Sequence, residues 1–253
     1  MQYRFRDLQP TLRDVFDDNP EEGFAFGDFD SRKAGLFLVE RTAPTPEEKE
    51  ITESVPYMQG VYDFSMYQNE RFFENREITY KLVIPIGVYH DRKGVEQDIK
   101  RQLMPLGRQA LIDTHEEIYY WIGKCKSVEA DDDSEKGLLT VTVVFDCYPF
   151  AFTNNLEGAD VWDDVYFDHW IWQPVKFNVN GKQDIQLENI GSHKVMSNFE
   201  VTGKVTIKGA FGTKTLDEKT DEKSSIPIQV GVNKITLDGK GTIWFKFRRE
   251  ELL

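Results

Sequence analysis

The sequence has little of the chemistry on which most enzymes and metal proteins depend. Its 253 residues include four histidines and two cysteines, and the histidines are scattered without the spacing of metal ligands. Serine-hydrolase, zinc-protease and phosphate-loop motifs do not occur in it. We therefore expect no enzyme, no catalytic residue, no metal and no cofactor. For Cys125 and Cys147 we expect buried, reduced thiols rather than a disulfide framework.

Long apolar runs and an excess of positive charge are also missing. No stretch approaches the ~20 apolar residues of a membrane-spanning helix, and the opening MQYRFRDLQP carries charges where a signal peptide needs an apolar core. We therefore expect that the protein does not insert into a membrane and that it is assembled in a cytoplasm. The formal net charge of -13 should repel nucleic-acid phosphates. The arginines are interleaved with acids and are interpreted as parts of mixed-charge surfaces, among them Arg71, Arg76, Arg92, Arg101, Arg248 and Arg249.

The first half of the chain contains several patterns typical of β-strands. Short apolar runs at residues 24–26 and 36–39 flank a turn, and residues 78–84 alternate between apolar and polar before Pro85. Two longer runs, EIYYWIGKCKSVEA and GLLTVTVVFDCYPFAF, are joined by the acidic loop DDDSEKG. The apolar residues of the second run share one face, with Asp146 on the other: Leu139, Val141, Val143, Phe145 and Cys147.

One helix is expected, in the segment DRKGVEQDIKRQLMPLG. Val95, Ile99 and Leu103 recur every four residues and form an apolar face, while the charged residues lie opposite. Pro105 follows as a stop signal. This short amphipathic helix is predicted to cover a sheet.

The segment of about residues 43–76 predicts an extended arm rather than part of a core. It combines several prolines with mixed charge, a composition that disfavours compact packing. An arm that reaches outward usually contacts a partner. The candidate intersubunit residues are Pro44, Pro46, Val55, Pro56 and Tyr57.

A different kind of sequence begins after Phe152. Residues 175–179 and 185–187 alternate on either side of Asn180-Gly181, which predicts a hairpin, and Asp238-Gly239 predicts another tight turn. Short strands are also expected in KVMSNFEVTG, KVTIKG, SIPIQV and TIWFKF. The pattern predicts a β-sandwich of jelly-roll or related kind. The expected domains are therefore an α+β domain, residues 1–152, and an all-β domain, residues 153–253.

The connection at the start of the second domain is dense in aspartate and tryptophan. Sugar hydrolysis needs two positioned carboxylates, but this segment has no period that would hold its acids at a fixed separation, and it lacks the glycine and glutamate of the helix-loop-helix calcium motif. A solvated connection is favoured for Asp160, Asp163, Asp164 and Asp168. A carbohydrate-binding module is the alternative function, with the contact aromatics Trp162, Trp170, Trp172 and Trp244.

Several motifs follow one another in a distinctive order over residues 24–152. They are FAFGDFDS with LFLV, VPYMQGVYDFS, FFENREITYKL, KGVEQDIKRQLM, YYWIGK and TVTVVFDCYPFAF. This succession resembles the phage distal tail protein family, abbreviated Dit, of long non-contractile tails. Each motif alone is weak, and their order carries the resemblance. VPYMQG departs from the family pattern, because Tyr57 and Met58 stand where many relatives have a glycine.

The resemblance implies a structural hub of the tail tip rather than a catalyst. It implies a mainly β fold in which the first domain forms a ring of six copies and a galectin-like β-sandwich projects outward. The implied partners are the major tail tube protein, the tail-tip hub or tail-associated lysin protein, and baseplate or receptor-binding proteins. Genomic DNA would pass through the ring without specific binding. The implied location is the tip of the virion tail of a phage with a Gram-positive host.

Overall fold

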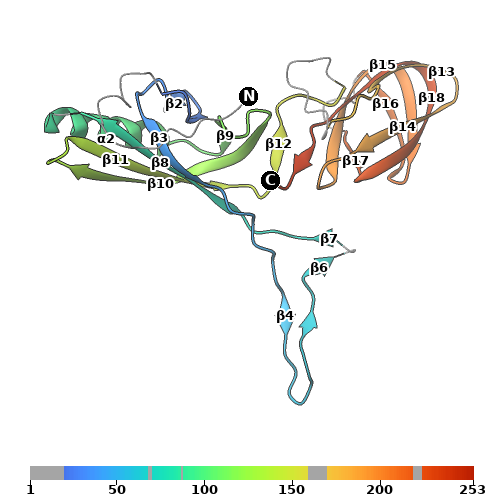
Figure 1. Ribbon diagram of the computed structural model, residues 1–253. Helices are drawn as coiled ribbons and strands as arrows, with labels where there is room; N and C mark the ends of the chain where they lie inside the picture. The colour runs from blue at the N-terminus through green and yellow to red at the C-terminus, as the bar shows by residue number, and fades with distance from the viewer. Residues whose placement is uncertain (1–19, 68–69, 87, 159–169, 219–223) are drawn as a thin grey trace. The chain divides into compact units, whose positions relative to one another are not determined.

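The computed structural model describes residues 20–67, 70–86, 88–158, 170–218 and 224–253 (Figure 1). The chain divides into two compact units: unit 1 comprises Met1–Glu117 and Trp121–Pro149, and unit 2 comprises Ile118–Tyr120 and Phe150–Leu253. Antiparallel strands dominate both units, and a single helix is present in the described residues. The predicted mainly β fold class is confirmed.

Unit 1 is built on one antiparallel sheet with the strand order β2-β1-β9-β10-β11-β8-β3. The first residues of β10 count with unit 2. In chain order the elements are β1 (Phe24–Phe26), β2 (Phe29–Asp30), β3 (Phe37–Thr42), β4 (Thr52–Glu53), β5 (Tyr62–Asp63), β6 (Met66–Tyr67), β7 (Glu70–Arg71), β8 (Arg76–Pro85), α2 (Tyr89–Leu103), β9 (Gln109–Asp113), β10 (Tyr119–Asp133) and β11 (Leu138–Cys147).

The alternation predicted for β11 is present in the sheet. Its apolar residues are buried on one face from Leu139 to Cys147, while Asp146 lies on the more accessible side and accepts a hydrogen bond from Asn75 at 2.9 Å. β11 ends two residues before Pro149, which cannot continue a ladder. The chain then enters β12 (Ala151–Thr153) of unit 2. The proline therefore stands where the chain leaves one unit for the other.

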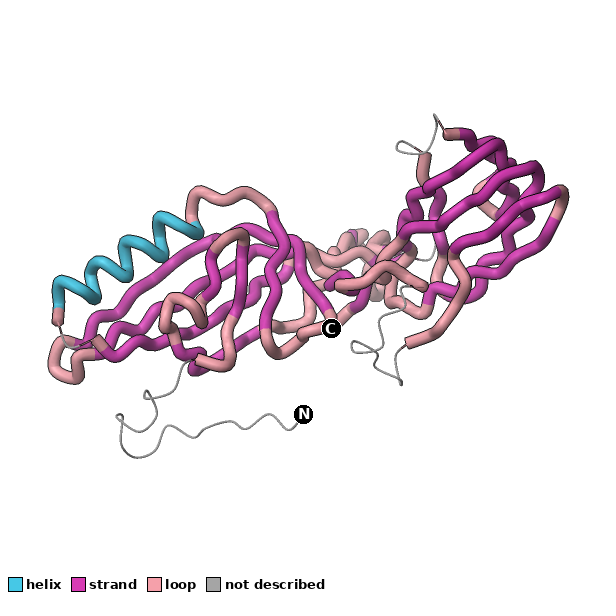
Figure 2. The backbone as a smooth tube through the Cα atoms, turned by 90° about the horizontal axis from the view of Figure 1, so that it is seen from above, coloured by secondary structure: helices cyan, strands magenta, loops and turns pink. Residues whose placement is uncertain are grey.

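Helix α2 lies along the strands of the unit 1 sheet (Figure 2). Ile99 and Leu103 are buried, as the four-residue spacing predicts. The interpretation of Arg92 as a surface residue is wrong, because its side chain is 2% exposed. Its guanidinium forms an ion pair with Asp132 of β10 and donates to the Ile86 carbonyl at 2.7 Å. Burial of this charge is therefore compensated by contacts that join the helix to the β10–β11 hairpin.

Both cysteines lie in the β10–β11 pair, but they do not face each other. Cys125 is opposite Phe145 and Cys147 is opposite Gly123, and both thiols are buried and free. Burial raises the pKa of Cys125 to about 11 and that of Cys147 to about 12. Near neutral pH, fewer than about one thiol in a thousand is then a thiolate.

We expect neither cysteine to react with iodoacetamide in the folded protein near neutral pH, because alkylation needs an accessible thiolate. Mass spectrometry should show no adduct before unfolding and adducts on both Cys125 and Cys147 after unfolding in guanidinium. Rapid alkylation of either cysteine in the native protein would contradict this prediction.

Unit 2 is also antiparallel, with β18 at its centre. In chain order its strands are β12 (Ala151–Thr153), β13 (Lys176–Asn180), β14 (Gln183–Asn189), β15 (Val195–Gly209), β16 (Gly212–Asp217), β17 (Ile226–Ile228), β18 (Gly231–Lys246) and β19 (Glu250–Glu251). Buried residues alternate along β15 and β18 and enclose one core, including Val201, Val205, Ile207, Ile235, Leu237, Ile243 and Phe245.

The hairpin predicted around Asn180-Gly181 is wrong. Gly181 does adopt a positive φ of 90°, but both flanking strands pair with β18, β13 along residues 240–244 and β14 along residues 231–237. The two strands therefore follow one another along a single edge of β18. The Asn180-Gly181 pair determines the local turn, whereas the pairing partner of each flanking strand depends on the distant strand β18.

Two further expectations about unit 2 are corrected by the long central strands. KVMSNFEVTG and KVTIKG form one strand, β15, and Asp238-Gly239 lies inside β18 rather than in a tight turn between strands. β15 and β18 approach closely where Gly203 faces Gly241. A Cβ atom at Gly241 would lie 1.9 Å from the Thr202 oxygen, so only glycine fits there.

Candidate functional site

The first candidate surface is the arm, residues 43–75, which connects β3 to β8 (Figure 1). Its two legs are joined by the bridge between Glu48 and Phe73 and by the pairing of β4 with β5. β6 and β7 form a small hairpin within the returning leg. Such isolated two-stranded ribbons have little stability of their own in water. Packing against a partner would therefore stabilise the arm.

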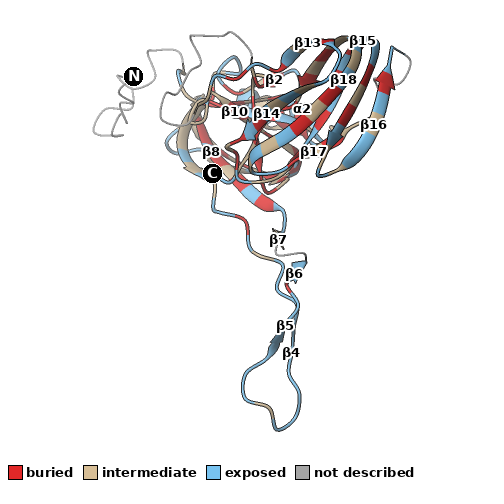
Figure 3. Cartoon of the chain, turned by 90° about the vertical axis from the view of Figure 1, so that its right-hand side faces the viewer, coloured by how far each residue is buried: buried red, intermediate tan, exposed pale blue. Residues whose placement is uncertain are grey.

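Most residues of the arm are exposed (Figure 3), and many of its exposed side chains are apolar. The rings of Tyr62 and Phe64 stack on each other with centroids 6.1 Å apart, and both remain more than half exposed. Contiguous exposed apolar residues mark interaction sites more often than single ones do. The exposed apolar side chains of the arm are Ile51, Val55, Tyr57, Val61, Tyr62, Phe64, Met66, Tyr67 and Phe72.

Tyr57 occupies the outer turn of the arm in a conformation that disfavours its side chain. Its φ is 67°, and it is the one non-glycine residue with positive φ in the described chain. This left-handed conformation costs a non-glycine residue about 1–2 kcal/mol. The tyrosine is also fully exposed. A strained and exposed aromatic is typical of a contact residue, so Tyr57 remains a candidate for binding.

The other predicted intersubunit residues lie at different places in the arm. Val55 and Pro56 are exposed beside Tyr57, and Pro44 is exposed near the root. Pro46 is buried. The outer turn thus brings Val55, Pro56 and Tyr57 together on the accessible surface.

At the root of the arm, two arginines pack on the buried ring of Trp121. The guanidinium carbons of Arg41 and Arg76 lie 5.4 and 5.8 Å from its centroid, a favourable cation–π geometry. Arg76 donates to the Ala43 carbonyl at 2.8 Å and so ties down the first residue of the arm. Burial lowers the pKa of Arg76. The interpretation of Arg76 as a surface residue is wrong, since it is 3% exposed.

Asp113 completes the root beneath these arginines. Its carboxylate accepts hydrogen bonds from Arg41 Nε at 2.7 Å, from the Tyr80 hydroxyl at 2.6 Å, and from backbone N–H groups. Burial and the nearby Asp113 charge raise the pKa of Tyr80 well above its ordinary value. Burial opposes the charge on Arg41, but Asp113 raises the pKa of that arginine overall. This bonded cluster gives the arm a rigid base, and nothing in the sequence distinguishes Asp113 from a surface acid.

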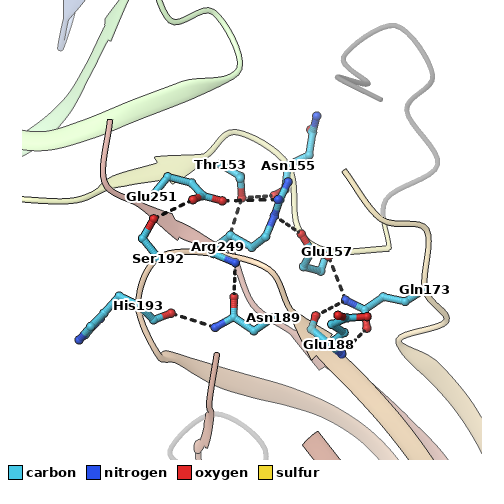
Figure 4. A network of polar contacts seen from close by, with 11 residues as sticks. Thr153, Asn155, Glu157, Gln173, Glu188, Asn189, Ser192, His193, Arg249 and Glu251 are labelled. Carbon is cyan, nitrogen blue, oxygen red and sulfur yellow. Dashed lines mark hydrogen bonds and ion pairs between the residues drawn. The ribbon is translucent and has the colours of Figure 1, made fainter. Parts of the chain in front are cut away.

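The second candidate site is a polar network in unit 2 (Figure 4). Arg249 and Glu157 form an ion pair with Nε and Oε1 2.7 Å apart, and their side chains are 5% and 4% exposed. Glu157 also accepts a hydrogen bond from Gln173 Nε2 at 3.1 Å. Gln173 donates to the Glu188 carbonyl at 2.6 Å and accepts from the Glu188 N–H at 2.8 Å. The side-chain amide of Gln173 thereby pairs with the backbone of β14 as the backbone of a neighbouring strand would.

The expectation that Arg249 lies on a surface is wrong, because its side chain is buried. Ile243, Phe245 and Phe247 precede it at two-residue steps, and all are buried. The alternation therefore pointed Arg249 inward, whereas its charge suggested the surface. Its neighbour Arg248 is exposed, as expected.

The candidate sugar-contact aromatics differ in accessibility. Trp170 is half-buried, and Trp172 is 68% exposed. Trp244 is half-buried, and the ammonium groups of Lys246 and Lys176 lie 4.2 and 5.8 Å from its ring centroid. Lysines thus already occupy the ring of Trp244. The remaining residues of that prediction lie outside the described residues: Asp160, Trp162, Asp163, Asp164 and Asp168.

Two further findings concern metals and membranes. Within the described residues, no three His, Cys, Asp or Glu side chains are grouped so that they could hold a metal ion. No helix in that part of the chain has the length and apolar character needed to cross a bilayer.

Comparison with known proteins places the fold. No family model and no curated protein sequence matches the chain. The crystal structure of the SPP1 Dit protein (gp 19.1), described as a paradigm of the hub adsorption apparatus in phages infecting Gram-positive bacteria, matches with a TM-score of 0.62. The match covers 91% of this chain and 99% of that chain at 11% sequence identity. The chain has the Dit fold.

The phage P2 baseplate in its activated conformation with Ca is a weaker neighbour. Its TM-score is 0.40 at 7% identity, over 88% of this chain and 92% of that chain.

The Dit resemblance predicted from the order of motifs is confirmed at the level of the fold by the SPP1 protein. Because the match covers 91% of this chain, it includes residues of both units.

Proposed function

We propose that the chain is a structural hub of a phage tail tip, with no catalytic role. In this proposal residues 1–152 form a closed ring of six copies around a central channel. Residues 153–253 form the galectin-like domain that projects outward. The observation that carries the proposal is the Dit fold over 99% of the SPP1 protein, which is described as part of a hub adsorption apparatus.

The arm supports assembly into a ring. Exposed β-ribbons and apolar side chains are liabilities in a monomer, and closed rings cover such surfaces by repeating one heterologous interface. The arm exposes nine large apolar residues from Ile51 to Phe72. We propose that it crosses to the neighbouring copy, with Tyr57 at its outer turn.

The partners follow from the position of such a hub in a tail. On one side the ring would bind the major tail tube protein and extend the tube. On the other side it would bind the tail-tip hub or tail-associated lysin protein. The outer domain would carry baseplate or receptor-binding proteins. The net charge of -13 would let genomic DNA pass through the channel without specific binding.

The proposal predicts a hexameric mass for the purified full-length chain. The mass measured by light scattering at increasing concentration should approach six times the 29.4 kDa of the monomer, because in a closed ring every arm contacts a neighbouring copy. Negative-stain images of the same sample should show rings with a central hole. A monomer at every concentration, also after addition of the tail tube protein, would contradict the proposal.

A further inference from the structure

Unit 2 contains a groove of about 370 Å³ that none of the assembly surfaces explains. The segment before β13, strand β14 and the start of β18 form its walls. The groove is lined by Ile171, Trp172, Gln173, Gln186, Glu188 and Val232. Small-molecule sites are concave, with an apolar platform and a few polar groups that orient the ligand. This groove has both kinds of lining.

The platform is Trp172, which is 68% exposed although it is one of the largest side chains of the unit. Its chain neighbour Gln173 is 8% exposed and is held by two hydrogen bonds to the backbone of Glu188. Gln173 is bonded in turn to Glu157, which pairs with Arg249. The buried network (Figure 4) therefore fixes the backbone that presents an exposed indole to the groove. The backbone beside Trp172 is thus already ordered, and it needs little further ordering when a ligand binds.

The polar lining complements hydroxyl groups. Gln186 and Glu188 are exposed and share the outward side of β14, and Val232 of β18 stands opposite Glu188. A glutamine amide both donates and accepts hydrogen bonds, and a carboxylate accepts from two hydroxyls. A pyranose ring offers an apolar C–H face for the indole and a rim of hydroxyls for these side chains. Glu188 is the charged side chain among the described lining residues, so it disfavours an anionic ligand.

We propose that this groove binds an uncharged saccharide, with Trp172 stacked on a pyranose ring and Gln186 and Glu188 hydrogen-bonded to its hydroxyls. The site goes beyond the hub role, which requires no sugar. The proposed contact residue is Trp172 rather than Trp244, which is half-buried and has the ammonium groups of Lys246 and Lys176 at 4.2 and 5.8 Å from its ring centroid. An uncharged cell-surface polysaccharide is the ligand class that fits.

The test is titration of the full-length chain with oligomers of glucose, galactose and N-acetylglucosamine, followed by tryptophan fluorescence and calorimetry. At least one oligomer should bind with a dissociation constant of about 0.1–1 mM, a common range for a shallow site. Trp172→Ala should weaken binding at least about tenfold, while Trp172→Tyr retains most of it. The matched control Trp244→Ala should leave the affinity unchanged.

Folding of the variants is checked by thermal unfolding, which should not change for Trp172→Ala because the side chain is mostly exposed. Absence of binding by all three oligomers at about 10 mM would overturn the proposal. Binding of an anionic polysaccharide alone, or equal affinity of Trp172→Ala and the unchanged chain, would also overturn it. These outcomes do not depend on ring assembly, because the groove lies within unit 2.

Discussion

Replacing Arg249 with alanine should lower the free energy of unfolding of unit 2 by about 3–5 kcal/mol. The substitution leaves the Glu157 carboxylate 4% exposed without the guanidinium that compensates its burial. Gln173 remains as a donor to Glu157, but one neutral amide does not balance a buried charge. Urea unfolding, with hydrogen exchange resolving the amides of β13 to β18, should locate the loss in unit 2.

Two variants separate this mechanism from general damage. Arg248 is the exposed neighbour of Arg249, and Arg248→Ala should change stability by less than about 0.5 kcal/mol. The double variant Arg249→Met with Glu157→Gln should be more stable than Arg249→Met alone, because it leaves no unpaired buried charge. If Arg249→Ala were as stable as Arg248→Ala, the ion pair would not have the structural role assigned to it.

Removing the outer arm should abolish ring formation while leaving both units folded. Glu48 and Phe73 are bridge partners, so residues 49–72 can be replaced by Asn-Gly, a pair suited to a two-residue hairpin turn. The deletion removes the exposed aromatics Tyr62, Phe64 and Tyr67. Burying each in a neighbour contributes about 1.5–3 kcal/mol. Their combined loss should weaken each contact by at least about a thousandfold.

A triple variant tests the same interface with the arm intact. The substitutions Tyr62→Ser, Phe64→Ser and Tyr67→Ser together should shift the mass from ring to monomer in light scattering, with an unchanged thermal transition. Ile112→Ser is the matched control, because Ile112 is 43% exposed but lies in β9 outside the arm. Rings that persist without the arm would show that another surface closes the ring. They would leave the hub proposal standing and reject the role of the arm.

Much of unit 1 could be predicted because its signals are local. The two-residue alternation of β11 determines which of its residues are buried, and the four-residue spacing of Ile99 and Leu103 places the face of α2. The prolines near residues 44–56 predicted an extended segment, and the structure has an arm there. The ordered motifs were enough to indicate the Dit fold without significant sequence similarity to any curated protein.

The candidate sites could be predicted less well, because they depend on which distant residues meet. Arg92 and Arg249 were interpreted as surface charges, and each is buried against an acid from another part of the chain. The sequence also does not predict the pairing partner of β13 and β14. The Asn180-Gly181 turn is compatible both with a hairpin and with two consecutive strands that each pair with β18. A turn residue specifies local backbone geometry, not the strand on the other side.

By itself, the sequence determined the mainly β character, the place of the helix, the extended arm and the order of motifs that resembles Dit. The periodicity of apolar residues and the restrictions of proline act over a few residues, so they can be read without a structure. Only the tertiary structure decided that Gln173, bonded to Glu157, lines a groove together with Trp172, and that Arg76 contacts both Ala43 of the arm and Trp121. Burial of a charge is favourable only when its partner is in place, and that partner is brought there by the whole fold.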